Sequence, residues 1–304
     1  MRWQKRGLIY GPDGFSSWAK HSALTPTPLL INEDTIRVYV GFRDDEGVSR
    51  VGFVDVDAGN PSKIKKVSQT PVLDVGRPGA FDDNGIILGD VIKHNNKSYM
   101  YYVGFQLVEK AKFLAFTGLA ISSDNGNTFE KYSSAPILDR CNDEIYIRAI
   151  HSVMIENDIW KIWYGSGNAW EYINGIPYPR YNIRCLESPD GIRCNQESRL
   201  CIDAQNSEYR IGRPKVYKIQ DKYLMFYTKG TIEGAYTAGY AESCDGKKWN
   251  RKDDQIGITL SKSGWDSQSL SYPSLIQYEG DIYMFYNGND MGRDGFGYAE
   301  LIEW

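Results

Sequence analysis

One pattern occurs five times along the chain and constrains the fold more than any other feature of the sequence. Each copy begins with two or three apolar residues, passes through a polar turn, and ends in a strand rich in aromatic residues. The copies begin about 60 residues apart, a spacing typical of proteins built from repeated units. They are PLLINEDTIRVYVG (28–41), VIKHNNKSYMYYVG (91–104), VMIENDIWKIWYGSG (153–167), VYKIQDKYLMFYTKG (216–230) and LIQYEGDIYMFYNG (275–288).

Each copy leads into a further short strand rich in small and apolar residues. In three copies this strand is followed by DNG or DG, which is the usual signal for a tight hairpin turn. Apolar and polar residues alternate with period two, and helical periodicity is nearly absent. The sequence therefore predicts an all-β protein made of five four-stranded antiparallel units.

The two ends of the chain predict how the units are arranged. The chain stops at AELIEW (299–304), where every earlier copy would continue into an outer strand, and RWQKRGLIY (2–10) has the character of that strand. We therefore expect the N-terminal strand to complete the last unit. The predicted fold is one domain, residues 1–304, a five-bladed β-propeller whose ring is closed by the N-terminal strand.

The segment SSDNGNTF (122–129) matches the Asp-box pattern S-x-D-x-G-x-T-(W/F), which is found in sialidases and several other propeller proteins. Related sequences, SPDGI (188–192) and SCDGKKW (243–249), fall at the same turn of other units. Ser and Asp can accept hydrogen bonds from backbone N–H groups there, and Gly allows a positive φ. We therefore interpret these segments as turns. A sialidase would need six blades, so five repeats argue against that activity.

Charge and hydropathy exclude several classes of partner. The formal net charge is −4, from 35 basic and 39 acidic residues, which gives no overall footprint for nucleic acid or an anionic membrane. No run approaches 18 uncharged apolar residues, and the N-terminus lacks the apolar region of a signal peptide. We expect a cytoplasmic protein that recognises any anion locally.

The five cysteines show no metal-binding or disulfide pattern. They form an odd set without C-x-x-C, and none has a metal-ligand spacing with the three histidines. We expect free thiols in a reducing compartment, and neither a cofactor nor a metal site. The cysteines are Cys141, Cys185, Cys194, Cys201 and Cys244.

Residues that the repeat does not explain are the best candidates for a site. The inner strands of a propeller begin around a central funnel, so side chains near these positions line its mouth. Asp82 and Asp266 recur in equivalent places, which favours a structural role. Several cations on one small funnel are costly unless carboxylates or an anionic ligand neutralise them, and together they predict a site for an acidic or phosphorylated ligand. The residues that do not recur are Lys20, His21, Asp83, Asp90, Arg148, His151, Arg210, Arg213, Lys215 and Tyr272. The loops that follow the inner strands add Arg43, Asp44 and the aromatic-rich stretch 166–181 with Trp170.

The motifs YPSLIQYEGDIYMFYNGND (272–290), GRPKVYKIQDKYLMFYTKG (212–230) and FDDNGI (81–86) carry a family resemblance that covers essentially the whole chain. The chain resembles the five-bladed propeller glycosidases: the arabinanase and β-xylosidase group, the invertase-like enzymes and the β-mannoside phosphorylases. The resemblance implies one carboxylate in each of the first three blades, and an axial Ca²⁺ in some relatives. Only Asp90 matches, because Thr25 and Ala149 occupy the other two positions.

The missing carboxylates leave three interpretations open. Carboxylates from elsewhere on the funnel could catalyse glycoside hydrolysis, phosphate could serve as the nucleophile or acceptor, or the chain could bind glycans without catalysis. We expect a glycosidase-like enzyme acting on an acidic or phosphorylated sugar, with glycan binding or polysaccharide assembly as the alternative. The predicted catalytic residues are Asp90, Asp83, Glu208 and Glu171. The predicted substrate-binding residues are His21, Arg43, Asp44, Arg148, His151, Trp170, Arg210, Arg213 and Tyr272.

Overall fold

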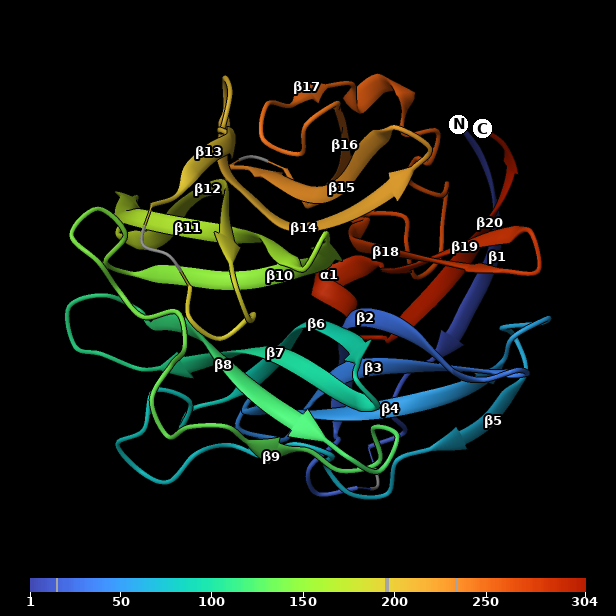
Figure 1. Cartoon of the computed structure of the whole chain (residues 1–304), viewed down its shortest axis with the longest axis horizontal. Helices are drawn as coiled ribbons and strands as arrows, with labels where there is room; N and C mark the ends of the chain where they lie inside the picture. Colours follow the sequence, from blue (N-terminus) through green and yellow to red (C-terminus); the bar gives the residue numbers. More distant parts are fainter. Residues whose placement is uncertain (15, 195–196, 233) are drawn as a thin grey trace.

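Antiparallel strands dominate the computed structural model, which describes residues 1–14, 16–194, 197–232 and 234–304 (Figure 1). The helical segments are the short 3-10 helix η1 (Asp253–Gln255) and α1 (Asn289–Gly292). Within the described ranges, no helix has both the length and the apolar character needed to span a bilayer. The protein is thus all-β, as the repeat predicts.

By their antiparallel pairing, the strands of the described residues form five four-stranded units, which correspond to the five copies of the repeat. The first unit contains β2 (His21–Asn32), β3 (Thr35–Arg43), β4 (Ser49–Asp57) and β5 (Ile64–Val67), and the second contains β6 (Ile86–His94), β7 (Lys97–Gln106), β8 (Leu114–Ser122) and β9 (Glu130–Lys131). The third contains β10 (Ile147–Glu156), β11 (Ile159–Ile173), β12 (Ile176–Ser188) and β13 (Arg199–Ile202), and the fourth contains β14 (Glu208–Ile219), β15 (Lys222–Thr231), β16 (Thr237–Ser243) and β17 (Asn250–Arg251). The fifth contains β18 (Ser271–Tyr278), β19 (Asp281–Asn287), β20 (Phe296–Glu303) and β1 (Arg2–Tyr10). Short parallel pairings of β8 with β10 and of β12 with β14 join the second, third and fourth units into one continuous sheet.

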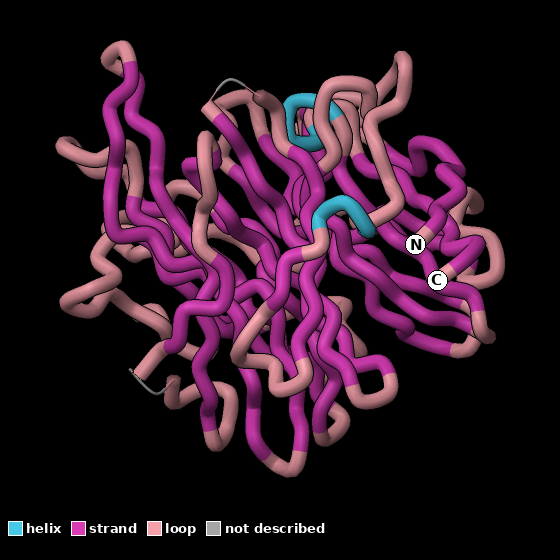
Figure 2. Tube along the Cα trace, turned by 90° about the horizontal axis from the view of Figure 1, so that it is seen from above, coloured by secondary structure: helices cyan, strands magenta, loops and turns pink. Residues whose placement is uncertain are grey.

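The fifth unit joins the two ends of the chain. Strand β1 pairs antiparallel with β20, with Trp3 opposite Leu301 and Leu8 opposite Gly297. The N- and C-termini consequently lie close together in both views (Figures 1 and 2). The N-terminal strand therefore supplies the outer strand of the last unit, as predicted.

A repeated polar triad supports the equivalence of β1 with the outer strand of another unit. In the second and fifth units, a buried aspartate accepts hydrogen bonds from a tyrosine of the neighbouring strand and from a lysine of the outer strand. Asp82 binds Tyr102 (3.0 Å) and Lys131 (2.6 Å), and Asp266 binds Tyr286 (2.9 Å) and Lys5 (2.6 Å). The predicted structural role of the two aspartates is therefore confirmed.

The Asp-box segment forms a turn held by its own side chains. Ser122 Oγ accepts the N–H of Gly126 (2.9 Å), and Asp124 Oδ1 accepts the N–H groups of Asn127 (3.0 Å) and Thr128 (3.1 Å). Burial opposes ionisation of Asp124, but hydrogen bonds from Ser122 and Thr128 lower its pKa to about 2. Ser188 with Asp190, and Ser243 with Asp245, make equivalent bonds. The interpretation of these segments as turns is confirmed.

Each of these turns also binds the preceding unit. A glycine of the turn has a positive φ and presents its carbonyl oxygen to an aromatic side chain on the second strand of that unit. The bonds are Tyr39 Oη to Gly126 O (2.9 Å), Tyr101 Oη to Gly191 O (3.0 Å) and Trp163 Nε1 to Gly246 O (2.9 Å). The turns therefore act as connectors between sheets as well as reversals of the chain.

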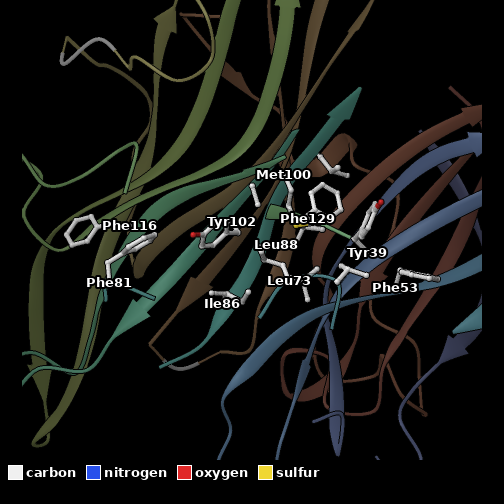
Figure 3. Packing of buried hydrophobic residues seen from close by; sticks show 14 of the residues in the cluster. Tyr39, Phe53, Leu73, Phe81, Ile86, Leu88, Met100, Tyr102, Phe116 and Phe129 are labelled. Carbon is white, nitrogen blue, oxygen red and sulfur yellow. The ribbon is translucent and has the colours of Figure 1, made fainter. Parts of the chain in front are cut away.

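Apolar packing joins the same neighbours. Five clusters of buried side chains each combine residues of two units: the first with the second, the second with the third, and so on to the fifth with the first. In the first cluster, Tyr39 and Phe53 of the first unit pack with Leu88, Met100 and Tyr102 of the second (Figure 3). The core of the protein is thus divided into layers between sheets.

Replacing Gly126 with Ala tests the connection between a turn and its neighbouring unit. A Cβ atom at Gly126 would lie 2.0 Å from Tyr39 Oη, and φ is +79° there. We expect Gly126→Ala to lower the free energy of unfolding by about 3 kcal/mol, from backbone strain and the lost hydrogen bond. Urea denaturation measures this change.

Gly175→Ala is the matched control, because Gly175 has a φ of +80° and a Cβ atom there would meet nothing within 4 Å. Its cost should be about 1 kcal/mol, from the backbone alone. Equal losses in the two variants would contradict a role of Gly126 in the contact between units.

Candidate functional site

The inner strands β2, β6, β10, β14 and β18 all carry an irregularity near their starts. In each, the pairing register with the next strand shifts at this point, which is the signature of a β-bulge. Thr25, Arg213 and Tyr272 lie at these shifts with φ of 56°, 53° and 58°. A left-handed backbone at residues other than glycine costs about 1–3 kcal/mol and concentrates at functional sites. The bulges re-aim the side chains of the inner strands.

A cluster of cations surrounds Tyr272. The Arg213 guanidinium lies 5.1 Å from the Tyr272 ring centroid, and Arg210 lies between the rings of Tyr209 (4.6 Å) and Tyr236 (4.0 Å). Burial raises the pKa of Tyr272, and the charges of Arg213, Arg210 and Arg43 oppose that rise. Arg43, Arg210 and Arg213, which we call the arginine cluster, therefore lie close enough to Tyr272 for their charges to act on its hydroxyl group.

Several donors of the arginine cluster lack acceptors. The buried atoms Arg43 Nε, Arg210 Nε and Arg213 Nη1 have no hydrogen-bond partner among the described residues. Arg213 does donate through Nη2 to the backbone oxygen of Leu88. Burial lowers the pKa of Arg213 to about 10, which reflects the cost of holding its charge away from water. Buried cationic donors without acceptors are costly, and an anion placed among them would remove that cost.

The carboxylate of Asp90 acts electrostatically on Arg213 of this cluster, and its direct partner is Lys215. The Lys215 Nζ atom lies 2.6 Å from Asp90 Oδ1 and 3.0 Å from the carbonyl oxygen of Gly89. Asp90 also accepts the N–H groups of Val91 (3.0 Å) and Val153 (2.8 Å). Asp90 thus contacts strands of the second, third and fourth units. Its negative charge is paired directly with Lys215, and it also interacts electrostatically with Arg213.

His151 is a neutral member of the site. Its side chain is buried, and Nδ1 has no hydrogen-bond partner in the part of the chain that the structure describes. Burial lowers the pKa of His151 well below its usual value, and the charges of Arg213 and Lys215 lower it further. A neutral imidazole can both donate and accept a hydrogen bond, so His151 suits contact with a polar ligand.

The other three predicted catalytic carboxylates are engaged elsewhere. Asp83 Oδ2 accepts the N–H of Gly79 (2.8 Å) and closes a loop. Glu208 binds Arg251 (2.7 Å), and Glu171 binds Arg180 (3.0 Å) on the β11–β12 hairpin. None of these contacts involves Asp90 or the arginine cluster, so the structure does not assemble the four carboxylates into one group.

Of the remaining predicted binding residues, one lies beside the arginine cluster and the others have partners elsewhere. His21 lies beside the arginine cluster: burial lowers its pKa first, followed by the charges of Arg293 and Arg43. Asp44 instead binds Arg50 (2.7 Å), and Arg148 forms a buried ion pair with Glu144 (3.3 Å). Trp170 packs edge-on against Phe113, with ring centroids 5.0 Å apart.

Sequence reasoning missed two aromatic members of the site and undervalued a third residue. Tyr209 and Tyr236 enclose Arg210, but neither was predicted as a binding residue. Tyr236 lies in a loop just before β16 and outside the repeat. That position was the one sign in the sequence that it could belong to a site. Lys215 was noted only as a residue that does not recur, although it is the partner of Asp90.

The residues present do not suit a Ca²⁺ ion. Calcium requires several oxygen ligands, whereas Asp90 is surrounded by Lys215 and backbone N–H groups. Among the described residues, no group of three or more His, Cys, Asp or Glu side chains could hold a metal ion. We therefore assign no chemistry to the axial calcium that the resemblance implied.

The sequence comparison identifies relatives of full length. No protein-family model matches the chain. It is 32% identical over 304 residues to the "Uncharacterized protein Rv1502" of Mycobacterium tuberculosis strain H37Rv, and the match covers 99% of both proteins. The chain belongs to the Rv1502 family. This chain therefore spans essentially the whole length of that relative.

The structural comparison shows where the fold of this Rv1502 family member occurs. It is similar to a glycosyl hydrolase from Bacteroides ovatus, with a TM-score of 0.74, 12% identity and coverage of 99% of this protein and 93% of that one. It is also similar to a thermostable family-43 glycoside hydrolase, with a TM-score of 0.71, 19% identity and coverage of 93% and 90%. A third similar structure comes from the GH130 family of mannoside phosphorylases, a family that contains glycoside hydrolases targeting β-1,2 mannosidic linkages in Candida mannan. Its TM-score is 0.66 at 14% identity, and the match covers 98% of this protein and 93% of that one. The resemblance to the propeller glycosidases is confirmed at the level of the fold.

Replacing His151 with Asn tests whether His151 stays neutral in the folded protein. Because its folded pKa is lowered, the unfolded chain gains a proton below pH 6.5 that the folded protein excludes. The stability that wild type derives from this group is therefore present above pH 6.5 and lost as pH falls. We expect the stability difference between wild type and His151→Asn to shrink by up to about 1.4 kcal/mol per pH unit below 6.5.

Urea unfolding between pH 5 and pH 8 measures this difference. His94→Asn, at the β6–β7 hairpin, controls for the loss of a histidine that lies outside the site. Parallel pH profiles for wild type and His151→Asn would show that the pKa of His151 is not lowered in the folded state.

Proposed function

We propose that the five units are the blades of one closed propeller, a single domain comprising residues 1–304. The antiparallel pairing of β1 with β20 supports this proposal, since it completes the fifth sheet with the start of the chain. The apolar cluster that joins Phe285 and Tyr298 of the fifth unit to Val38 and Val56 of the first supports it too. In this arrangement the bulged inner strands surround one central site.

The function that the site supports best is recognition of an anionic sugar by a glycosidase-like, carbohydrate-active protein. The observation that carries this proposal is the arginine cluster, whose buried donors have no acceptors among the described residues. A carboxylate or phosphate group would accept several of these N–H groups at once and offset the positive charge. An uncharged sugar would leave that charge unbalanced.

The aromatic side chains around the cluster support a sugar rather than a free anion. Tyr209 and Tyr236 are buried and their rings pack on Arg210, whereas Tyr272, beside Arg213, is half-buried. A sugar ring can stack on an accessible tyrosine ring such as that of Tyr272, and the tyrosine hydroxyl can bind a sugar hydroxyl at the same time. The likeness of the fold to glycoside hydrolases adds an analogy, because one fold can host unrelated functions.

For the chemistry, we propose glycosyl transfer that involves phosphate, with Asp90 as the group that exchanges a proton. A phosphate oxygen would bond to the anomeric carbon while the bond from that carbon to the glycosidic oxygen breaks. The leaving oxygen would receive, through Asp90, the proton that the phosphate loses. This route needs one carboxylate, whereas hydrolysis by a carboxylate pair needs two, and Asp83, Glu208 and Glu171 are bound elsewhere.

A second candidate function, glycan binding without turnover, is favoured by one observation. Asp90 already accepts hydrogen bonds from Lys215, Val91 and Val153, so its oxygens are largely committed to the protein. A propeller with this site could hold an anionic glycan for another enzyme or for polysaccharide assembly. We further propose a cytoplasmic location, on the basis of five cysteines without disulfides.

Anion binding is the first test of the proposed function. Saturating inorganic phosphate or glucuronate should stabilise the wild-type protein, by about 2.7 kcal/mol at 100 times the dissociation constant. Arg213→Gln should lose most of this stabilisation, because Arg213 belongs to the cluster without acceptors. Thermal unfolding with and without each ligand measures the effect. Arg2→Gln, whose side chain is exposed on the outer strand, should respond as wild type does.

Glucose at the same concentration serves as the uncharged control ligand. Stabilisation by glucose equal to that by glucuronate, or an unchanged phosphate response in Arg213→Gln, would contradict anion recognition by the cluster.

Asp90→Asn tests the proposed chemistry. Turnover of any glycoside found in a panel assayed with and without phosphate should fall by at least about 100-fold, the usual contribution of a proton-exchanging group. The variant should still be stabilised by phosphate, which shows that it folds. Glu171→Gln, on the β11–β12 hairpin, should retain wild-type turnover.

The assay also separates the two candidate functions. Phosphate-dependent release of a sugar phosphate supports glycosyl transfer, and release of reducing sugar without phosphate supports hydrolysis. Saturable glycan binding with no product supports the non-catalytic function.

A further inference from the structure

Two cysteines meet at the junction between the third and fourth units. Cys185 lies on β12 and Cys201 on the adjacent antiparallel strand β13. The pairing register shifts between these strands, so that Cys201 is the extra residue of a bulge near Cys185. Cys185 belongs to a buried apolar cluster, and Cys201 packs against the same cluster. The fold thus brings together two thiols that are 16 positions apart in the sequence.

A small cavity gives access to Cys185. It has a volume of about 100 Å³ and is lined by Cys185 together with Lys161, Trp163, Arg199, Gly246 and Lys247. The lining comes from the third unit and from the 243–249 turn of the fourth. A space of this size admits a molecule as small as hydrogen peroxide, since a single water needs only about 10–15 Å³ of the same measure.

We propose that Cys185 and Cys201 form a peroxide-sensitive dithiol that closes reversibly to a disulfide. This site is separate from the arginine cluster and does not depend on the function proposed for it. Cys185 is the thiol that reacts with the peroxide, and Cys201 is the thiol that resolves the product.

The surroundings of the pair assign these two roles. The hydrogen bond with Cys201 lowers the pKa of the Cys185 thiol, and burial opposes this effect. The positive charges of Lys247 and Arg199 lower the pKa further, whereas the negative charge of Glu187 raises it. The same hydrogen bond, with burial, raises the pKa of Cys201. Cys201 therefore keeps its proton. The thiolate is the reactive form of cysteine, so Cys185 attacks first.

The reaction balances with hydrogen peroxide as the oxidant. The Cys185 thiolate attacks one peroxide oxygen, the O–O bond breaks, and the departing hydroxide takes up a proton to become water. Cys185 is now a sulfenic acid. The Cys201 sulfur then attacks the Cys185 sulfur, the S–S bond forms, the S–O bond breaks, and a second water leaves with the Cys201 proton. A thiol reductant reverses the change.

Mass spectrometry of the full-length protein tests this proposal. After treatment with one equivalent of hydrogen peroxide and alkylation in denaturant, the number of alkylated cysteines should fall from five to three. Peptide mapping should show a bond between Cys185 and Cys201, and dithiothreitol should restore all five thiols. The free thiols of Cys185 and Cys201 should disappear at least 10 times faster than the free thiol of the exposed Cys244.

Variants separate the two roles. Cys201→Ser should leave Cys185 as a sulfenic acid that dimedone labels, whereas Cys244→Ser, the matched exposed control, should form the disulfide as wild type does. If Cys201→Ser fails to fold, the wild-type map alone decides. A disulfide to any other cysteine, or loss of Cys185 no faster than that of Cys244, would overturn the proposal.

Discussion

At the first three junctions between units, the packing of one sheet on the next depends on a hydrogen bond from an aromatic side chain to the carbonyl oxygen of a turn glycine. A four-stranded sheet has two faces, and each face must be covered by a neighbour before the sheet is stable. Tyr39, Tyr101 and Trp163 each place a ring in the layer between two sheets and bind the next turn with the polar end. The polar atom of each buried ring is thereby satisfied, and the relative position of two sheets is fixed.

The central site has the opposite character, because polar groups there are left unsatisfied. The inner strands are irregular where they start, and Thr25, Arg213 and Tyr272 hold a left-handed backbone that regular pairing would avoid. The surrounding sheets supply the stability that allows this strain. The same sheets hold the arginine cluster together despite the mutual repulsion of its charges, and this arrangement is the basis of the proposed anion site.

Much of the fold follows from local patterns in the sequence. The alternation of apolar residues specifies strands, and Ser122, Asp124 and Gly126 specify a turn through bonds within a few residues. Such interactions do not depend on distant parts of the chain, so five copies of the pattern predict five sheets. The pairing of β1 with β20 was predictable for a related reason: the last copy lacks one strand, and the N-terminus supplies a strand of that kind.

The sequence by itself determined the repeated sheets, their turns and the set of residues that the repeat does not explain. Only the tertiary structure decided which of those residues meet. Arg210 and Arg213 gather at Tyr272, whereas Arg148 is paired with Glu144, and Glu208 with Arg251. The physical reason is that contacts at the centre join side chains from different sheets, and their directions are set by bulges and neighbouring rings. Repeat spacing places a residue on a strand, but it does not specify the partner that its charge will find.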